Sequence, residues 1–450
     1  MIQSARIQMM KDGAGENGQY VLYWMQQAQR VRYNHALTYA IEEANTRNLP
    51  VVVVFGVTDD YPEANERHYA FMLEGLRDVS IALKKKKIQF VLQHQSPDEA
   101  ALSLAKDAAF LVMDRGYLKI QKLWRSRVVK EVSCGVVQVE TDVVVPVDVV
   151  TNKEEYAART IRPKIHRILE DYLMPVDEIA VKKSSLKMIF EGLDVSDVDG
   201  VLAKMKIDRS VGRVDTFVGG EKAAQKMLKA FLELRLDGYS VKRNDPNLNG
   251  VSHMSPYLHF GQISPLDILL QMQDVAGETE DTEVYLEELV VRRELSMNFV
   301  NQNPNYDRYD ALPEWAKKTL AKHEDDVRDY VYDLEVWEAA ETHDPYWNAA
   351  QMEMLKTGKM HNYMRMYWGK KVIEWSETPQ QAFETILYLN NRYELDGRDA
   401  NSFTGVAWCF GKHDRPWKER PVFGMVRYMN AKGLQRKFDV DGYVVKVGKL

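Results

Sequence analysis

The chain has little cysteine and no long hydrophobic run. Its 450 residues include only Cys134 and Cys409, too few and too far apart for a disulfide framework or a cysteine metal site, which fits a reducing cytosol. The N-terminus is charged and glycine-rich and lacks the apolar core of a secretion signal. The longest β-like apolar run, Val51–Val57, is far shorter than the ~20 residues that span a bilayer. We therefore expect a cytoplasmic protein without a membrane partner.

Two signatures of enzyme chemistry are also missing. The ten histidines show no HxxxH or HExxH spacing, so the sequence predicts no metal site. No GxSxG elbow follows a predicted strand, which argues against a Ser–His–acid hydrolase. A GxGxxG string does occur at residues 13–18, but it precedes the first predicted strand, whereas a dinucleotide-binding turn must follow a strand and open a helix. We interpret this string as a flexible leader.

Charge is unevenly distributed along the chain. The net charge of −6 and the pI near 6.0 do not indicate a general polyanion binder. Residues 411–450, however, hold ten Lys and Arg against four Asp and Glu, a local net charge of +6. This basic end favours a specific anionic partner, although on charge alone a solvated tail is an equal alternative.

The first 145 or so residues alternate short β-branched runs with longer helical stretches, which predicts a parallel sheet covered on both faces. Ligands of such sheets usually sit beyond the carboxyl ends of the strands. We expect strands at Tyr20–Met25, Val51–Val57, Gln89–Gln93, Phe110–Asp114 and Val136–Glu140, and helices at 26–48, 63–87, 97–107 and 118–132.

The rest of the chain reads as a connector followed by helices. Residues 151–215 are mixed in charge and poor in aromatics, as in a linker. Helical patterns then occur at 219–238, 265–275, 280–301, 327–340, 344–357, 359–375 and 379–392. We therefore predict an α/β, Rossmann-like parallel-sheet domain at 1–150, an interdomain linker at 151–215 and a large all-α domain at 216–450.

Tryptophan is concentrated near the C-terminus, with seven of nine residues after position 300. In the helix predicted at 359–375, Trp368 and Trp375 share one face about 10 Å apart along the axis. This spacing allows electron hopping, but it is also ordinary core spacing, and on its own it favours the core. Trp347 extends the line only if its helix packs against this one.

Charged side chains stand at two informative places in the predicted helices. Arg365 lies in an otherwise apolar stretch, and a buried arginine needs a carboxylate partner, for which Asp396 and Asp399 are candidates. The alternative is an arginine exposed on a polar face. Glu288 and Arg292 are four residues apart, a spacing at which the two could simply pair on the surface.

Several ordered motifs resemble the photolyase/cryptochrome family. Met360–Met366 is similar to the flavin-site helix of that family. Ser252–Ser255, followed by Pro-Tyr-Leu-His-Phe-Gly, resembles its FAD phosphate loop, and small hydroxyls before a helix suit phosphate capture. Stretches that resemble class II cyclobutane pyrimidine dimer (CPD) photolyases are Tyr23–Met25, Phe71–Leu73, Tyr156–Pro163, Arg243–Pro246, Thr342–Asn348, Arg392–Asp399 and Lys437–Asp439. The resemblance extends from about residue 20 to residue 440.

This resemblance implies a light-driven DNA repair lyase. FAD, active as FADH⁻, would inject an electron into a pyrimidine dimer flipped out of double-stranded DNA, split the ring and recover the electron. Flipping is physically required because a stacked base cannot reach a buried flavin. Some relatives also hold an antenna chromophore of deazaflavin or folate type. We expect a monomer.

The resemblance also assigns roles to individual residues. Glu288 would stabilise the dimer radical anion, Asn390 would lie near flavin N5, and Trp347, Trp368 and Trp375 would photoreduce oxidised flavin. The implied cofactor-binding residues are Tyr239, Ser252, Met254, Ser255, Asn362, Arg365, Asn390 and Asp396. The implied DNA and lesion contacts are Arg243, Asn244, Met366, Trp408, Arg415 and Trp417.

Two departures and two alternatives accompany this prediction. Glu140–Pro146 differs from the Asp-Ala-His-Asn-Val-Val-Pro of relatives, which leaves the antenna chromophore open, and Arg292 replaces a lesion-pocket Trp of some relatives. The first alternative is a cryptochrome-like blue-light photoreceptor, which would not need Glu288, Trp408, Trp417 and Arg415 together. The second is a flavin electron-transfer or nucleic-acid-binding protein without lyase activity.

Overall fold

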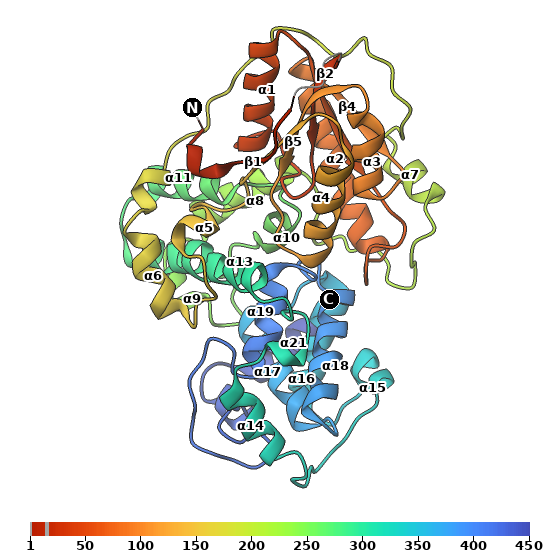
Figure 1. Cartoon of the computed structure of the whole chain (residues 1–450). Coiled ribbons are helices and arrows are strands. Elements are labelled where there is room, and N and C mark those ends of the chain that lie inside the picture. Colours follow the sequence, from red (N-terminus) through yellow and green to blue (C-terminus); the bar gives the residue numbers. More distant parts are fainter. Residues whose placement is uncertain (1, 14–17) are drawn as a thin grey trace.

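The computed structural model describes residues 2–13 and 18–450 and has an α/β half and a helical half (Figure 1). The α/β half is built from the N-terminal part of the chain, and the helices of the C-terminal part form the other half. Most of the glycine-rich string at 13–18 falls on residues 14–17, outside the described residues. No helix of the described residues is both long and apolar enough to cross a membrane.

A six-stranded sheet forms the centre of the α/β half. Its strand order is β1-β6-β5-β2-β3-β4. The strands are β1 (Ile7–Lys11), β2 (Tyr20–Trp24), β3 (Val51–Gly56), β4 (Gln89–Gln93), β5 (Ala108–Asp114) and β6 (Gly135–Val139). All neighbours are parallel except β1, which pairs antiparallel with β6. The five predicted strands are confirmed, whereas β1 was not predicted.

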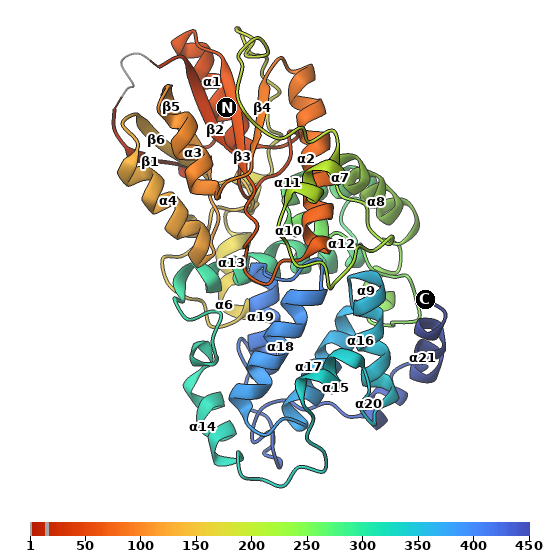
Figure 2. The same ribbon diagram turned by 90° about the vertical axis from the view of Figure 1, so that its right-hand side faces the viewer.

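Helices cover both faces of the sheet because successive strand residues point to opposite sides. In β2, Val21 and Tyr23 pack under α1 (His35–Arg47) and α2 (Glu66–Lys85). Leu22 and Trp24 pack on the other side, in the core with α3 (Pro97–Ala105) and α4 (Lys119–Glu131). Figure 2 shows α2 and α4 on opposite sides of the strands. The run of buried residues in β2 is what a doubly covered strand requires.

The helix predicted at 26–48 begins only at His35, and its first part is an irregular loop. The buried carboxylate of Asp114 accepts hydrogen bonds from the backbone N–H groups of Gln26, at 3.0 Å, and Ala28, at 2.6 Å. These bonds hold the chain in a non-helical path at the carboxyl end of β2. The Asn34 side chain then accepts from Leu37 N and caps the helix.

Short helices that pack on their neighbours follow β6. Helix α5 (Val147–Val150) ends just before the predicted connector, and the connector itself contains α6 (Ala158–His166), η2 (Leu169–Tyr172) and α7 (Val198–Lys204). Val201 and Leu202 of α7 join the core on one face of the sheet. Leu193 pairs with Leu92 as an isolated bridge beside β4.

The helical half confirms every helical region predicted after residue 216, although 327–340 shrinks to α15. The helices are α8 (Glu221–Leu234), α9 (Tyr239–Lys242), α10 (Ser255–His259), α11 (Pro265–Ala276), α12 (Glu280–Leu286), the π-helical turn η3 (Glu287–Arg292), α13 (Arg293–Gln302), η4 (Tyr309–Ala311), α14 (Glu314–Lys322), α15 (Leu334–Ala339), α16 (Pro345–Thr357), α17 (Asn362–Glu374), α18 (Pro379–Tyr393), α19 (Ala400–Cys409), α20 (Ala431–Gln435) and α21 (Val440–Gly448). The short helices α9, α10, η4 and α20 were not predicted. The longer helices α14, α19 and α21 were not predicted either. A large aromatic core lies among α13 to α19.

Candidate functional site

Arg365 of α17 meets two carboxylates from the loop after α18. Its Nη2 lies 3.1 Å from Asp396 Oδ1, as predicted, and 2.9 Å from Glu394 Oε2, which was not predicted. Asp399, the other predicted candidate, lies instead 3.8 Å from His259 Nδ1. The tight turn at 394–397 turns residues 394 and 396 toward Arg365, whereas Asp399 caps α19.

The charges in this cluster are set by burial and by Arg365. Burial alone would raise the pKa of Asp396, but Arg365 and Lys359 outweigh it and leave the pKa below its usual range. Burial raises the pKa of Glu394 to about 8, since Arg365 offsets it only in part. Arg365 therefore keeps Asp396 ionised, while burial makes the Glu394 carboxyl beside the same guanidinium a weaker acid.

Next to this ion pair lies a group of buried polar atoms with few partners. The backbone N–H of Tyr363 donates to His361 Nδ1 at 3.3 Å, so His361 carries its proton on Nε2, and the ring interacts with the backbone of Arg243. Arg365 Nε is buried without a partner in the described chain, while Ser255 Oγ, also buried, interacts with the Asp396 carboxylate. Burial and then Lys359 lower the pKa of His361 to about 4. Buried donors beside the partly buried Lys359 fit a phosphate-bearing ligand.

The remaining predicted cofactor residues differ in their exposure. Asn390 is buried in α18, and Tyr239 is buried with its ring edge-on to Phe231. Met254 is a fully buried core residue, so its side chain packs against protein. Ser252 is partly buried, while Asn362 is exposed at the first position of α17.

The tryptophans form a continuous buried line that includes one residue the sequence did not indicate. Trp347 and Trp368 stack with centroids 6.1 Å apart and planes 12° apart. No ring contact joins Trp375 directly to either of them among the described residues. Trp337 lies between, 4.8 Å from Trp347 and 6.2 Å from Trp375. Trp337 stands on a different helix, α15, so helical spacing gave no signal for it.

The line ends near the surface. The Trp375 ring lies 6.0 Å from Tyr332 and 4.6 Å from His343. His343 stacks at 3.5 Å on Tyr330, whose side chain is 44% exposed. An unbroken series of aromatic rings therefore runs from Trp368 to solvent.

Glu288 and Arg292 do not pair with each other, contrary to the surface ion pair predicted from their spacing. Glu288 Oε1 accepts from Arg243 Nη1 at 2.8 Å. Arg292 Nε instead donates to Glu287 at 3.1 Å, and its guanidinium lies 5.2 Å over the Trp408 ring. The reason is the π-helical turn η3, in which residues five apart face each other, and such turns often mark functional sites.

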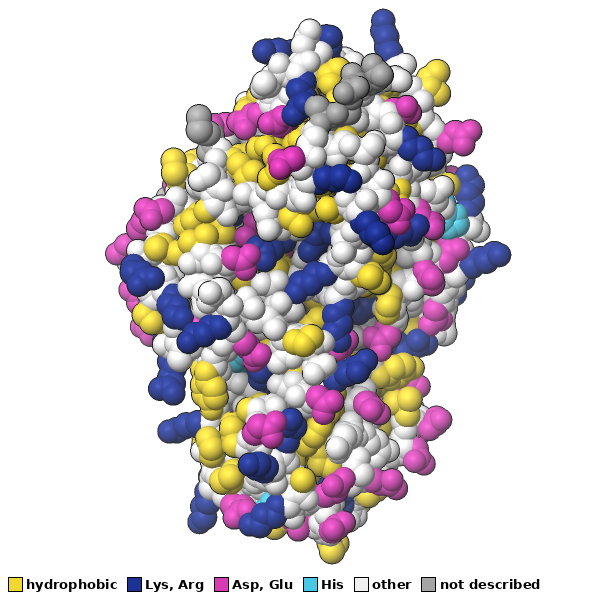
Figure 3. Space-filling view, viewed as in Figure 1, with side chains coloured by type: hydrophobic (Ala, Val, Ile, Leu, Met, Phe, Trp, Pro, Cys, Tyr) yellow, Lys and Arg dark blue, Asp and Glu magenta, His cyan; other side chains and the backbone are white. Residues whose placement is uncertain are grey.

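The basic C-terminal segment presents an aromatic surface. Trp417 is 42% exposed and lies between the guanidinium groups of Arg415, at 5.5 Å, and Arg427, at 5.2 Å. Asn244 and Met366, the other predicted lesion contacts, are partly buried. Figure 3 shows Lys and Arg gathered at the lower left edge, over α6, α9 and the C-terminal segment, with acidic side chains on the lower right.

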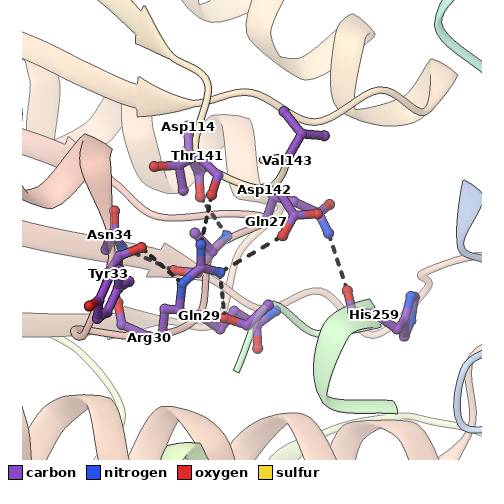
Figure 4. Close-up of polar contacts among 12 residues, drawn as sticks. Gln27, Gln29, Arg30, Tyr33, Asn34, Asp114, Thr141, Asp142, Val143 and His259 are labelled. Carbon is purple, nitrogen blue, oxygen red and sulfur yellow. Dashed lines mark hydrogen bonds and ion pairs between the residues drawn. The ribbon is translucent and has the colours of Figure 1, made fainter. Parts of the chain in front are cut away.

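A cavity of about 120 Å³ lies between the two halves, beyond the carboxyl ends of β2 and β3, where the sheet topology predicts a ligand. Its wall includes the loop Met25–Gln29, the end of β3 and, from the helical half, His259 and Asp399. Figure 4 shows Gln27 Nε2 donating to the His259 carbonyl, at 3.2 Å, across this seam.

The segment Glu140–Pro146, which departs from its relatives, does not line this cavity. Its Asp142 pairs with Arg293 of α13 at 2.8 Å and lies 3.8 Å from Arg30. Arg30 also donates to the carbonyl of Thr141 at 2.7 Å (Figure 4). The segment Glu140–Pro146 therefore lies at the interface between the α/β half and the helical half.

Comparisons with known proteins agree with this geometry. A model of the DNA photolyase family matches residues 21–182. A deoxyribodipyrimidine photo-lyase of Methanothermobacter thermautotrophicus is 50% identical over 99% of both chains. One of Arabidopsis thaliana is 39% identical over 100% of this chain and 94% of its own. The chain therefore belongs to the DNA photolyase family, the deoxyribodipyrimidine photo-lyases.

Solved structures share the architecture at low sequence identity. A class III photolyase of Agrobacterium tumefaciens has a TM-score of 0.75 at 19% identity, covering 96% of this chain and 86% of its own. A cryptochrome of Synechocystis has a TM-score of 0.72 at 15% identity, covering 95% and 88%. Because a photolyase and a cryptochrome both match, the fold alone does not separate repair from signalling.

Proposed function

We propose that this chain is a class II photolyase that repairs cyclobutane pyrimidine dimers in double-stranded DNA. The observation that carries the proposal is the pair of Arg243 with Glu288, which lies in the same π-helical turn as Arg292, whose guanidinium lies over the Trp408 ring. A dimer flipped out of the duplex needs an apolar stacking surface and a hydrogen-bonding group at its carbonyl edge. This site offers both.

The cofactor proposed for the helical half is FAD. When bound, reduced FAD supplies the photoexcited electron that splits the dimer, and it takes the electron back. Arg365 and Asp396 would lie beside the isoalloxazine ring. The buried Ser255 Oγ and the His361 Nε2–H would bond the phosphates, with Tyr239, Ser252 and Asn362 completing the contacts. The position of Met254 in the core limits its contact to the backbone.

Glu288 would orient and stabilise the dimer. Arg243 engages its Oε1, which leaves Oε2 as the acceptor for an N–H group of the dimer. Its side chain is 34% exposed, so the carboxyl group is accessible from the DNA face while Arg243 restricts its rotamer. Asn244 and Met366 would border the lesion, Trp417 would stack on it, and Arg415 would fill the gap left in the duplex.

The cavity between the halves is the proposed place for an antenna chromophore of deazaflavin or folate type. It is a concave site that mixes aromatic walls such as Tyr61 and Trp124 with glutamine amides. We accordingly assign residues 1–150 to light harvesting, 151–215 to the linker and 216–450 to catalysis, in a monomeric cytoplasmic enzyme.

The test is light-dependent reversal of dimers. The purified, reduced protein is mixed with an oligonucleotide that contains one thymine dimer and is illuminated with near-UV or blue light. We expect thymine absorbance near its maximum to return in the light and to stay constant in darkness. Bound flavin without any return of absorbance would favour the photoreceptor alternative. Equal binding to intact and damaged duplex, again without repair, would favour a general nucleic-acid-binding flavoprotein.

A further inference from the structure

Asn391 of α18 is held in a single amide orientation by two opposite groups. Its Nδ2 donates to Glu63 Oε2 at 2.5 Å, and its Oδ1 accepts from the backbone N–H of Arg398 at 2.9 Å. An ionised carboxylate only accepts and a backbone N–H only donates. The amide therefore cannot turn over without losing both bonds. The side chain is buried, so water does not replace them.

This fixed amide in turn orients its neighbour Asn390. Asn391 Oδ1 lies 3.3 Å from Asn390 Nδ2, and the same Nδ2 bonds the hydroxyl of Ser402. The Ser402 hydroxyl lies 3.4 Å from Asn391 Oδ1 and donates to it, which leaves its oxygen as the acceptor. Both N–H bonds of Asn390 are thus engaged. Its Oδ1 receives no hydrogen bond from the described residues and is the free end of the amide.

The loop that carries Glu63 is built to reach this helix. Glu63 is 328 residues from Asn391 in sequence and lies between β3 and α2. It has a positive φ of 57°, an uncommon conformation for a residue other than glycine that must be stabilised by its surroundings. Two residues on, Asn65 Nδ2 donates to the Arg392 carbonyl at 2.7 Å and fixes the loop against the end of α18.

We propose that Asn391 and Glu63 are positioning residues that turn the carbonyl oxygen of Asn390 toward the flavin. The inference rests on the proposed function, in which Asn390 lies near flavin N5. A carbonyl oxygen accepts a hydrogen bond from a protonated N5, whereas an amide N–H favours an unprotonated N5. Through Glu63, the α/β half contributes to the chemistry of a cofactor bound in the helical half.

The test measures the protonation of the flavin after it takes up one electron. The flavin-loaded protein is illuminated with an added thiol as electron donor, so that each flavin gains one electron and, at N5, a proton from solvent. The protonated and unprotonated forms have different visible spectra. In Asn391→Leu, the Ser402 hydroxyl remains, but it both donates and accepts and cannot fix the Asn390 amide. We expect the ratio of protonated to unprotonated form to fall roughly fivefold, the effect of one neutral hydrogen bond.

Two variants of the surface loop refine the test. Glu63→Ala removes one of the two anchors of Asn391, so we expect a smaller shift in the same direction, roughly twofold. Glu63→Gln keeps an acceptor oxygen and should restore the wild-type spectrum. The matched control is Asn298→Leu, an equally buried asparagine that bonds the backbone of Glu155 and Lys153 at a different place. It should leave the ratio unchanged.

The outcomes separate this inference from the proposed function. Wild-type protein without flavin or without dimer repair would defeat the proposed function itself. Wild-type repair combined with an unchanged ratio in Asn391→Leu overturns only the positioning role. If the Asn391→Leu protein does not fold, the Glu63→Ala protein provides the test of the positioning role, because Glu63 lies on an exposed loop. A shift in Asn391→Leu without one in Glu63→Ala would confine the role to Asn391.

Discussion

The Trp347 indole donates from Nε1 to the carbonyl of Trp368, at 3.0 Å, while the two rings stack at 6.1 Å. This hydrogen bond fixes the Trp347 ring beside the Trp368 backbone, and Gln351 Oε1 accepts from Trp368 Nε1 at 2.9 Å. Both indoles are fully buried. Two hydrogen-bonded, parallel indoles in a dry core differ from loosely packed aromatics because their relative position is fixed.

Trp368→Phe should abolish photoreduction of oxidised flavin while sparing repair by protein that has been chemically reduced beforehand. Phenylalanine keeps the packing but is far harder to oxidise. Absorption spectra under illumination with a thiol follow the first reaction, and dimer reversal follows the second. Unchanged photoreduction would refute the role of this pair.

Trp337→Phe tests the link that only the three-dimensional structure revealed. If electrons pass from Trp375 through Trp337 to Trp347, photoreduction should slow by at least an order of magnitude, because the gap must then be crossed in one step. The matched control is Trp315→Phe, another tryptophan of the helical half that has no ring contact with this line in the described chain. Equal rates in both variants would remove Trp337 from the pathway.

The alternating pattern in the first 145 residues predicted the sheet because its strands are buried on both faces and appear as apolar runs. Strand β1 was not predicted because three of its five residues are exposed, as is usual for an antiparallel edge strand. The loop at 26–34 has a helical pattern but lies unwound, since Asp114 binds its backbone from 86 residues away. Such a contact is invisible to local periodicity.

The sequence predicted the candidate site only where a short motif contains the residues that form it. Arg365 signalled a buried ion pair by standing in an apolar helix, and Asp396 was found. Glu394 was missed because only the turn geometry brings it to the same guanidinium. The ion pair assumed for Glu288 and Arg292 failed because the spacing rule applies to an α-helix, and this stretch is π-helical.

Arg365→Met should destabilise the flavin-free protein by about 3 kcal/mol, because it leaves the buried Asp396 carboxylate without its partner. Urea unfolding measures the change. Asp396→Asn should cause a loss of similar size, and the double variant should lose clearly less than the two losses added, since the two residues form one interaction. As a control, Lys229→Met removes an exposed pair with Glu233 four residues away and should change stability by less than about 0.5 kcal/mol. Additive losses at Arg365 and Asp396 would contradict the ion pair.

Mild acid should destabilise the flavin-free protein in part because His361 is held neutral. Burial, followed by Lys359 and Lys446, lowers its pKa to about 4, whereas an unfolded histidine has a pKa of about 6.5. Below pH ~6.5 His361 binds a proton in the unfolded chain but not in the folded chain, so the free energy of unfolding falls as the pH drops toward 4. The full effect is about 3 kcal/mol.

His361→Gln should flatten this pH dependence. Urea unfolding at pH 7 and pH 5 gives the difference, which should be smaller in the variant than in the wild type. Because every other titrating group is common to both proteins, the comparison isolates His361. A variant with the same loss between the two pH values would show that His361 is not held neutral.

Trp417→Ala should weaken binding to dimer-containing duplex much more than binding to intact duplex. Stacking of a base on an aromatic ring contributes ~1–3 kcal/mol, and Trp417 is exposed between two arginines that steer it toward DNA. We expect roughly a tenfold loss for the damaged duplex and little change for the intact one, measured by fluorescence titration. Binding to both should weaken with salt, and the slope should stay as in the wild type because no phosphate contact is lost. Tyr330→Ala, which removes a similarly exposed aromatic near the end of the tryptophan line, is the control. If it reduces discrimination as much as Trp417→Ala does, the aromatic surface beside Arg415 is not where the lesion binds.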